Sequence, residues 1–552
     1  MMADDKVLKT SLSTVACGHA TPKLSSRDDI ELARLGKKPA LNRSFSFLTI
    51  LGFSCTVLCT WEGTLSLFLT GYVNGGPSGI IYGYIVVWAG TLSLFATLSE
   101  LVSMAPTSGG QYHWVFMLSP PKARKFLSYL TGWLALTGWQ ASVAASAYLT
   151  GTQIQGLILL THQSYALVMK PWHSTLLFWA VILISFIINS AVSTTLAKFE
   201  GIVLILHILG FFAVLLPVVL LGTPGTSTSV FTSWLDLGGW QTQGLSFSIG
   251  ILGNVFAFLG ADGAIHMSEE IRNAAVVLPR SLLAGLTLNG ILGFAMLITI
   301  LYFVGDIDVA LSENPLYPYM SILKENLRSI PAAAVLSAII VVMAFSVTIA
   351  ALASTSRLYW AFSRDRGLPG WTWLKRVHPR TKIPINSVVI TAIISIILSL
   401  VNFGGAAAFT GTISNTISGL FGSYLIACSL LLYRRLTGGL GSHTSYDEHD
   451  ISPSGPPSPR WGPWKLPRIL GIANNAFTCV FLMYTLFFSF WPTYREVTPA
   501  NMNWAVLVTV VVMGASVLHY AIWGKNVFHG PIIEITEPQE GSSELELAQR
   551  IE

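Results

Sequence analysis

Two acidic residues lie inside hydrophobic stretches of this chain, where a carboxylate can bind a proton or a cation. Glu62 interrupts the stretch 45–72, and Asp262 interrupts the stretch 245–267. A carboxylate within a bilayer costs about 2.5–3.5 kcal/mol on insertion scales, so such residues usually serve a function. Each is a candidate counter-charge for a solute ammonium group, or a candidate proton carrier. The alternative for both is a structural carboxylate bonded to neighbouring N–H groups.

Small and polar residues around each carboxylate predict a break in a helix. The two interruptions are Cys59-Thr60-Trp61-Glu62-Gly63 and Gly260-Ala261-Asp262-Gly263. A break frees N–H groups that attract a carboxylate and C=O groups that attract a cation. We expect Gly63 and Thr64 to begin the second half of the first helix and to offer their N–H groups to a substrate carboxylate, while Gly260 and Gly263 permit the second break.

Three further residues are substrate-binding candidates. Trp61 and Phe258 flank the two interruptions, and aromatic faces hold ammonium groups by cation–π attraction. Gln140 is a polar residue inside the stretch 126–158. The alternative for the aromatic residues is ordinary packing.

The coupling-ion candidates are Glu62, Ser354, Thr355 and His207. Ser354 and Thr355 could supply oxygen ligands to a sodium ion, although hydroxyls within helices more often bond their own carbonyls. His207 could relay protons, or it could be a buried histidine with satisfied nitrogens.

The composition excludes an ordinary soluble protein. The 552-residue chain has a mean hydropathy of +0.61 and only 11% charged residues, against about 25% in soluble domains. Runs near 20 apolar residues predict membrane helices. Twelve such spans are predicted, near 45–72, 79–104, 126–158, 174–195, 200–222, 245–268, 281–304, 331–361, 384–403, 409–433, 469–491 and 502–523.

The basic residues predict the orientation. With the N-terminus in the cytoplasm, 28 of the 32 Lys and Arg residues fall on the cytoplasmic side. Residues 1–44 show no cleavable signal peptide and are expected to form a disordered cytoplasmic tail. Residues 524–552 are expected to form a second disordered cytoplasmic tail, and a Pro- and Ser-rich linker around 452–457 to be flexible.

The spacing of the two interruptions predicts an inverted repeat. They fall on spans one and six, and an odd number of spans per repeat turns the second copy upside down. We expect residues 45–222 to form the first repeat and 245–433 the inverted second one, with 469–523 outside it. Two broken helices would then meet near the middle of the bilayer.

Short motifs spread over about 480 residues resemble one family. They are Thr60-Trp61 followed by Gly75-Gly76-Pro77, then Ser99-Glu100-Leu101, Gly109-Gly110-Gln111-Tyr112-His113-Trp114, Pro120-Pro121-Lys122, Asp262 with His266-Met267-Ser268-Glu269-Glu270, Pro279, and Phe362-Ser363-Arg364-Asp365-Arg366-Gly367-Leu368-Pro369. In this order they resemble the amino acid–polyamine–organocation superfamily, and within it the fungal amino acid/choline transporter family, which includes choline and GABA permeases.

The resemblance implies a leucine-transporter-type fold of twelve helices, with substrate between broken helices 1 and 6 and helices 3 and 8. It also implies uptake of small amines or amino acids at the plasma membrane, commonly coupled to protons. The chain departs from the superfamily in one place. Trp61 and Glu62 stand where the first break is usually rich in glycine, and the added negative charge favours a cationic ligand.

These features predict a secondary active transporter for choline, GABA, an amino acid or a polyamine, working by alternating access with H⁺ or Na⁺. An exporter of a cationic secondary metabolite is the first alternative. A membrane sensor that binds the solute without moving it is the second. A membrane enzyme is disfavoured because the chain shows no nucleophile–base set, metal motif or phosphate-binding loop. We expect membrane lipid as a partner, and no cofactor, metal or nucleic acid.

Overall fold

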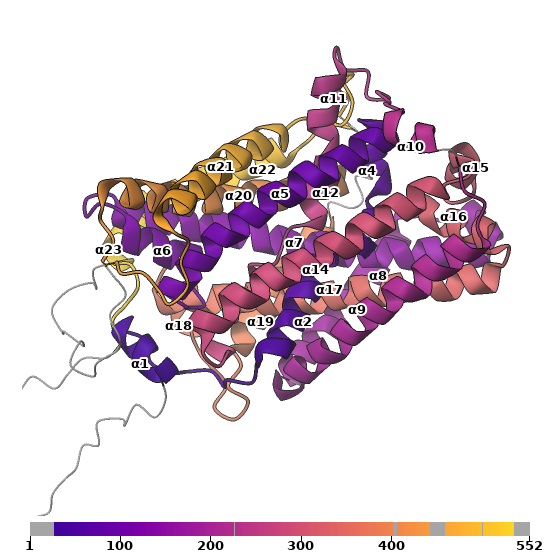
Figure 1. Cartoon of the computed structure of the whole chain (residues 1–552). Helices are drawn as coiled ribbons and strands as arrows, with labels where there is room; N and C mark the ends of the chain where they lie inside the picture. The colour runs from indigo at the N-terminus through magenta and orange to yellow at the C-terminus, as the bar shows by residue number, and fades with distance from the viewer. Residues whose placement is uncertain are drawn as a thin grey trace, which may run out of the picture.

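Helices make up nearly all the regular structure of the described chain. The computed structural model describes residues 27–191, 193–225, 227–400, 406–441, 459–499 and 501–534. Strand-type pairing within these residues is limited to three isolated bridges. The long helices lie side by side in one bundle (Figure 1). This follows from the sequence, because a segment in lipid must satisfy its backbone hydrogen bonds internally.

Within the described residues, ten helical stretches are long and apolar enough to cross a membrane, and each lies on a predicted span. Two shorter apolar helices, Gln243–Ala257 and Ile385–Ser399, lie on the predicted sixth and ninth spans. The main helices are α2 (Phe47–Leu58), α3 (Thr60–Ser66), α4 (Phe68–Val73), α5 (Gly76–Met104), α7 (Arg124–Thr161), α8 (Pro171–Ala191), α9 (Ser193–Leu221), α11 (Gln243–Gly250), α12 (Leu252–Ala257), α13 (Gly263–His266), α14 (Ala274–Tyr302), α17 (Ile330–Arg364), α19 (Ile385–Ser399), α20 (Ala406–Thr437), α21 (Arg468–Phe488) and α22 (Ala505–His519).

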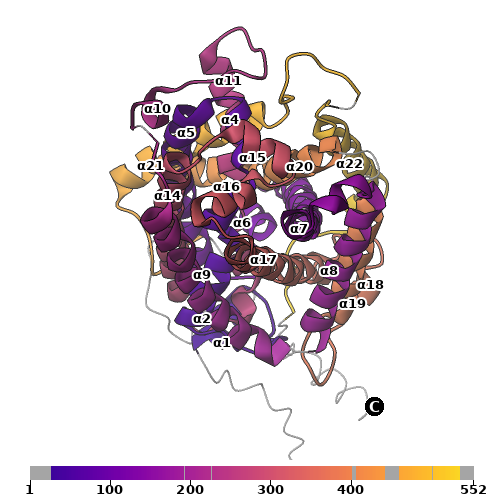
Figure 2. The ribbon, with the colours of Figure 1, turned by 90° about the vertical axis from the view of Figure 1, so that its right-hand side faces the viewer.

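Helix α7 occupies the interior of the bundle. Figure 2 looks along the bundle and shows α7 nearly end-on with other helices around it. It packs along α17 and α20. At Gly138 of α7 an added Cβ would lie 2.6 Å from the backbone nitrogen of Leu420, so α7 and α20 approach closely. Small residues at such contacts let membrane helices pack backbone to backbone.

The break next to Glu62 in the first helix is confined to one residue. Cys59 has φ 44°, in the left-handed region, and separates α2 from α3. The prediction of an interruption from Cys59 to Gly63 is therefore wrong in extent, because the helix resumes at Thr60. The Asn289 side chain provides the reason, since its Oδ1 accepts the Thr60 N–H at 3.2 Å and satisfies the new helix start.

The second interruption spans 258–262, between α12 and α13. Gly260 has φ 102°, a conformation that residues with a side chain rarely adopt. A Cβ at Gly260 would also lie 2.6 Å from the Val57 side chain of α2. Glycine is therefore required both by the backbone turn and by the close approach of the two interrupted helices.

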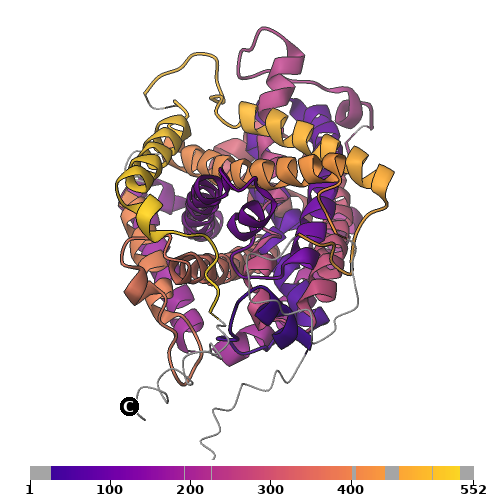
Figure 3. The ribbon, with the colours of Figure 1, turned by 90° about the vertical axis from the view of Figure 1, so that its left-hand side faces the viewer.

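Both ends of the chain contribute ordered segments to one end of the bundle. Figure 1 places α1 (Arg27–Arg34) and α23 (Lys525–Val527) together there, opposite α11 and α15 (Ile307–Glu313). Figure 3 views this end and shows the C-terminal segment crossing it. The Glu534 N–H bonds the Gly36 carbonyl, which joins the two tails.

The prediction of disordered tails is thus wrong for 27–44 and 524–534. The Lys37 ammonium is buried in an ion pair with Asp365, and the Ile532 N–H donates to the same carboxylate at 2.9 Å. These partners lie more than 150 residues away in sequence, so composition alone could not reveal them. Residues 1–26, 535–552 and the predicted flexible linker around 452–457 lie outside the described residues.

Candidate functional site

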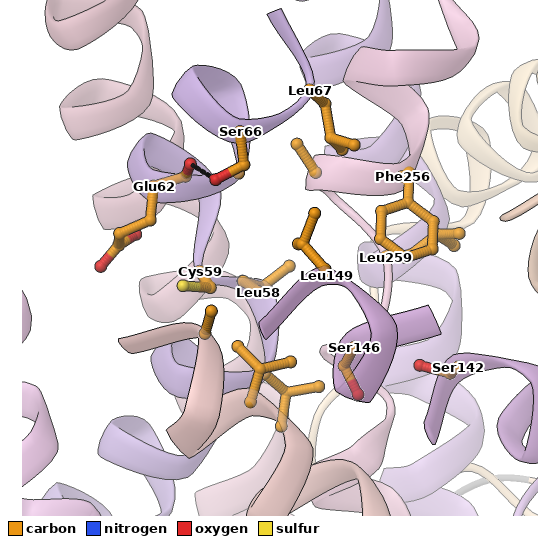
Figure 4. Close-up of a pocket in the computed structure, with 15 residues that line it drawn as sticks. Leu58, Cys59, Glu62, Ser66, Leu67, Ser142, Ser146, Leu149, Phe256 and Leu259 are labelled. Carbon is orange, nitrogen blue, oxygen red and sulfur yellow. Dashed lines mark hydrogen bonds between the residues drawn. The ribbon is translucent and has the colours of Figure 1, made fainter. Parts of the chain in front are cut away.

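A cavity of about 50 Å³ lies between four parts of the bundle, and it is large enough for more than one water molecule. Its walls come from the α2–α3 junction, α7, the α12 region and α17. Apolar side chains dominate the lining. Its polar members are Cys59, Glu62, Ser66, Ser142 and Ser146. Figure 4 shows Ser142 and Ser146 on the wall opposite Glu62, with Leu149 and Phe256 between.

Glu62 is the only charged residue in this lining, and its carboxylate points away from Leu149 and Phe256 (Figure 4). The side chain is buried, and Oε1 lies 2.8 Å from Nδ1 of His207, which is on α9. The second carboxylate oxygen, Oε2, and the second ring nitrogen, Nε2, have no hydrogen-bond partner. The pair therefore has one open acceptor and one open ring nitrogen within a buried site, an arrangement that can hold or pass on a proton.

Trp61 stabilises this pair and does not line the cavity. Its Nε1 donates to the His207 carbonyl at 3.2 Å, and its ring packs against Phe211 on α9. Trp61 is fully buried at the α3–α9 contact. Its expected cation–π contact with a solute therefore finds no support in its position.

The two interrupted helices meet beside the cavity. The Thr60 hydroxyl donates to the Ala257 carbonyl at 3.0 Å, and a Cβ on Gly63 would lie 3.4 Å from the Ala257 side chain. The carbonyl at the end of α12 is thus satisfied by the first residue of α3. Both breaks border one cavity, so movement of either half-helix changes its shape.

Asp262 lies outside this cavity and is held by neutral donors. Its Oδ2 accepts from Gln111 Nε2 at 2.9 Å and from Trp139 Nε1 at 3.1 Å. His266 Nε2 is 3.8 Å away. These contacts tie the second break to α7 and to α6 (Gln111–Leu118), which fits a structural carboxylate better than a solute ligand.

The remaining predicted residues mostly bond within the protein. The expectation that Gly63 offers its N–H to a solute is wrong, because that N–H already donates to the Cys59 carbonyl at 2.8 Å. Gly63 itself lines the cavity. The Thr64 hydroxyl donates to the Thr60 carbonyl, and Phe258 packs on Tyr84.

Three other predicted residues contact different helices. Gln140 donates to Ser395 Oγ at 2.8 Å on α19. The Ser354 hydroxyl donates to the Gly263 carbonyl at 3.2 Å, which fixes α17 against the second break. Thr355 donates to the Ala351 carbonyl at 2.7 Å, the common bond of a helix hydroxyl.

Sequence reasoning missed the hydroxyl wall of the cavity. Ser142 and Ser146 stand four residues apart on α7 and therefore face one direction. This spacing was the available signal, although Ser and Thr are common at many helix contacts. Ser66 and Phe256 complete the lining near Glu62, and nothing in their local sequence marks them.

The tail-bearing end of the bundle holds a second group of buried charges, which are paired. Arg364 binds both oxygens of Glu269, at 2.9 and 2.7 Å, and Arg357 Nε lies 2.8 Å from Glu270. Burial by itself would raise the pKa of Glu269, but the paired guanidinium holds it below its ordinary value. Asp365 likewise keeps a lowered pKa despite burial, because Lys37 and Arg364 lie beside it. No cluster of three metal-ligating side chains occurs within the described residues.

Comparison with known proteins gives a consistent family. A model of the amino acid permease family matches residues 45–512. The chain is 27% identical over 491 residues to a choline transporter of Saccharomyces cerevisiae, covering 89% of this chain and 83% of that one. It is 26% identical over 528 residues to an uncharacterized amino-acid permease of Schizosaccharomyces pombe, covering 94% and 90%.

Proposed function

Because the chain belongs to the amino acid permease family, we propose that it is a proton-coupled secondary transporter of a small organic cation. The family match and these relatives identify a multi-pass membrane transporter of amino acids or amines, and not an enzyme. The proposal adds the charge of the solute, the coupling ion and the mechanism. Choline and related amines are the first candidates, since a similar protein bears the name choline transporter.

The charge of the cavity carries this proposal. Among the lining residues Glu62 is the only ionisable acid, and none is basic. A cation entering an apolar cavity needs a counter-charge, because an unpaired buried charge is costly. A zwitterionic amino acid would also need a donor for its carboxylate, and with the Gly63 N–H already bonded the lining offers only neutral serine hydroxyls, a cysteine thiol and no basic group. Apolar walls with Phe256 suit the methyl groups of an alkylated ammonium.

The Glu62–His207 pair supports protons as the coupling ion. Both side chains are buried, 2.8 Å apart, and each retains an unpartnered polar atom. The sodium candidates Ser354 and Thr355 instead donate to carbonyls of Gly263 and Ala351. We therefore place the coupling proton on this pair, next to the solute.

We infer alternating access by movement of the interrupted helices. The two shorter apolar helices would complete twelve spans in a 5+5 inverted repeat, with α2–α3 and α11–α13 as its broken members. The ion pairs at the tail-bearing end would form the closed cytoplasmic side. We place both termini in the cytoplasm from the distribution of basic residues. We propose the plasma membrane because the family resemblance implies it.

Uptake into proteoliposomes tests this function. Labelled choline, GABA, a neutral amino acid and a polyamine would be offered under an imposed pH gradient and, separately, a sodium gradient. We expect concentrative uptake of a cationic amine under the pH gradient alone. Binding without flux would identify a sensor instead, and uptake driven only by sodium would overturn the proton assignment. Movement from the cytoplasmic side alone would indicate the exporter.

A further inference from the structure

A buried carboxylate on α9 takes no part in the cavity. Glu200 lies within the apolar stretch Leu196–Leu221 and has no exposed surface. Neither of its carboxylate oxygens has a hydrogen-bond partner. Glu200 is not at a helix start, because α9 begins at Ser193.

The surroundings of Glu200 favour the protonated acid. Burial is the main reason, because the carboxyl group is removed from water and no hydrogen bond to either oxygen replaces it; the nearby polar side chain is Thr56 of α2. The Thr56 hydroxyl donates its hydrogen bond to the Gly52 carbonyl, at 2.9 Å. It therefore has only a lone pair to offer Glu200. A lone pair can accept from a protonated carboxyl but repels an ionised one. An isolated carboxylate with no donor in an apolar contact would be very costly, so Glu200 holds a proton here.

Charged groups on the neighbouring helices do not compensate Glu200. Within the described residues no basic or acidic side chain of the packed helices acts on it, and Lys198 on the same helix is exposed. The Cys55 thiol of α2 interacts with Asn289, and Arg357 of α17 is paired with Glu270. The contact between α2 and α9 is tight here, since a Cβ on Gly52 would lie 2.5 Å from the Glu200 carbonyl.

Glu200 lies on the same face of α9 as His207, the histidine of the proposed Glu62–His207 proton pair. It precedes His207 by two helical turns, so both face α2–α3, about 10.5 Å apart along the axis. Between them an apolar cluster of Cys59, Val203 and Met343 separates the two groups. Next to Glu200, a Cβ added at Gly201 would lie 3.9 Å from the side chain of Thr49, which is in the first turn of α2 near the predicted cytoplasmic end.

We propose that Glu200 is the proton-release residue on the cytoplasmic side of the transport path, an inference that rests on the proposed proton coupling. A proton leaving the Glu62–His207 pair forms the O–H bond of the Glu200 carboxyl when water bridges the apolar cluster. Separation of α2 from α9 then admits cytoplasmic water. The O–H bond breaks, the proton passes to water, and Glu200 remains as a carboxylate until the next proton arrives.

Glu200→Gln tests the proposal, because the amide copies the neutral acid but cannot release a proton. In proteoliposomes we expect proton-driven net uptake of labelled choline to fall on the order of a hundredfold. Exchange of labelled for unlabelled choline at equal pH should persist, since exchange needs no proton release. Glu62→Gln should lose both activities. The matched control is Glu313→Gln, a half-exposed acid on α15, which should behave as wild type.

Infrared difference spectra of the full-length protein provide a readout without substrate. At neutral pH the wild type should show the C=O band of a protonated carboxyl in an apolar site, and Glu200→Gln should lack it while Glu313→Gln retains it. Spectra that coincide for wild type and Glu200→Gln would overturn the proposal. So would normal proton-driven uptake by Glu200→Gln. Absence of proton-driven uptake in the wild type, with the band present, would reject the proposed coupling and not the protonated state of Glu200.

Discussion

Buried carboxylates occur in two regions of this molecule, and the two groups differ in whether a basic side chain pairs with them. At the tail-bearing end, Glu269, Glu270 and Asp365 each bind a buried Arg or Lys. In the middle of the bundle, Glu62 has only a histidine, and Glu200 has no charged partner in the described chain. Full compensation holds a structure together, whereas partial compensation leaves a group able to change its protonation state.

The same comparison distinguishes the helices that we expect to move from the end of the bundle that buried ion pairs hold together. The paired charges join the segment after α1, η2 (Ser268–Glu270), the end of α17 and the C-terminal segment. The cavity instead touches both helix interruptions, where the contacts between helices are hydrogen bonds of neutral groups and the Glu62–His207 pair. We therefore expect substitutions in the middle to change transport at constant stability, and substitutions at the tail-bearing end to change stability first.

The largest effect is expected from Glu62→Gln. Loss of the cavity's single negative charge and of the proton site should reduce uptake on the order of a hundredfold or more. Surface expression and thermal stability should remain close to wild type, because Gln still accepts from His207. Uptake by proteoliposomes and a melting curve in detergent measure the two. Unchanged uptake would remove Glu62 from the site.

Arg364→Leu should give the largest loss of stability. It leaves Glu269 buried without its bidentate partner, a change that typically costs about 3–5 kcal/mol. The double variant Arg364→Leu with Glu269→Leu should recover part of that loss, since it removes the orphaned charge. The exposed pair provides the matched comparison, because Lys324→Met should cost about 0–1 kcal/mol. If Arg364→Leu and Lys324→Met lost equal amounts of stability, the buried ion pairs would not be what holds the tail-bearing end together.

Acid should weaken the tail-bearing end. Glu269 and Asp365 have lowered pKa values in the folded protein, so they contribute stability above the pKa of about 4 that carboxyl groups have in unfolded chains. That contribution is lost as the pH falls through their lower folded pKa values. The melting temperature of wild type in detergent should therefore drop below about pH 4. The variant Glu313→Gln should show the same fall in melting temperature at low pH. A melting temperature that stays constant down to about pH 2 would contradict the contribution of Glu269 and Asp365 to stability.

The smallest effects are expected from two aromatic residues: Phe256, which lines the cavity, and Trp61, which packs behind Glu62. Phe256→Leu changes the cavity wall and should raise the KM for the solute severalfold. Trp61→Phe removes the hydrogen bond to the His207 carbonyl and part of a fully buried ring, so we expect a stability loss of about 1–3 kcal/mol and an unchanged KM. If Trp61→Phe raised the KM for the solute and Phe256→Leu left it unchanged, Trp61 would be the solute ligand.

The sequence predicted the helical membrane fold and the unusual status of Glu62, because a carboxylate in an apolar stretch is visible locally. His207 was a candidate by residue type, but its contact with Glu62 spans 145 residues and depends on packing. Asp262 looked equivalent to Glu62 in sequence. Its bonds to Gln111 and Trp139, from distant segments, set it apart.

The interruption of the first helix shows a similar limit. Gly63 suggested a long break, yet Asn289 satisfies the helix start at Thr60 and confines the left-handed turn to Cys59. The ordered tail segments could not be predicted, because Lys37 is buried only through its pairing with Asp365. Local patterns locate helices and isolated charges, and long-range partners decide which of those charges stay available.

The most direct measurement is a structure of the full-length protein with the transported amine bound. We expect the cationic nitrogen in the cavity between Glu62 and Phe256, with Ser142 and Ser146 on the opposite wall and Asp262 still bonded to Gln111. Solute density beside Asp262, or in any site without contact to Glu62, would contradict this expectation.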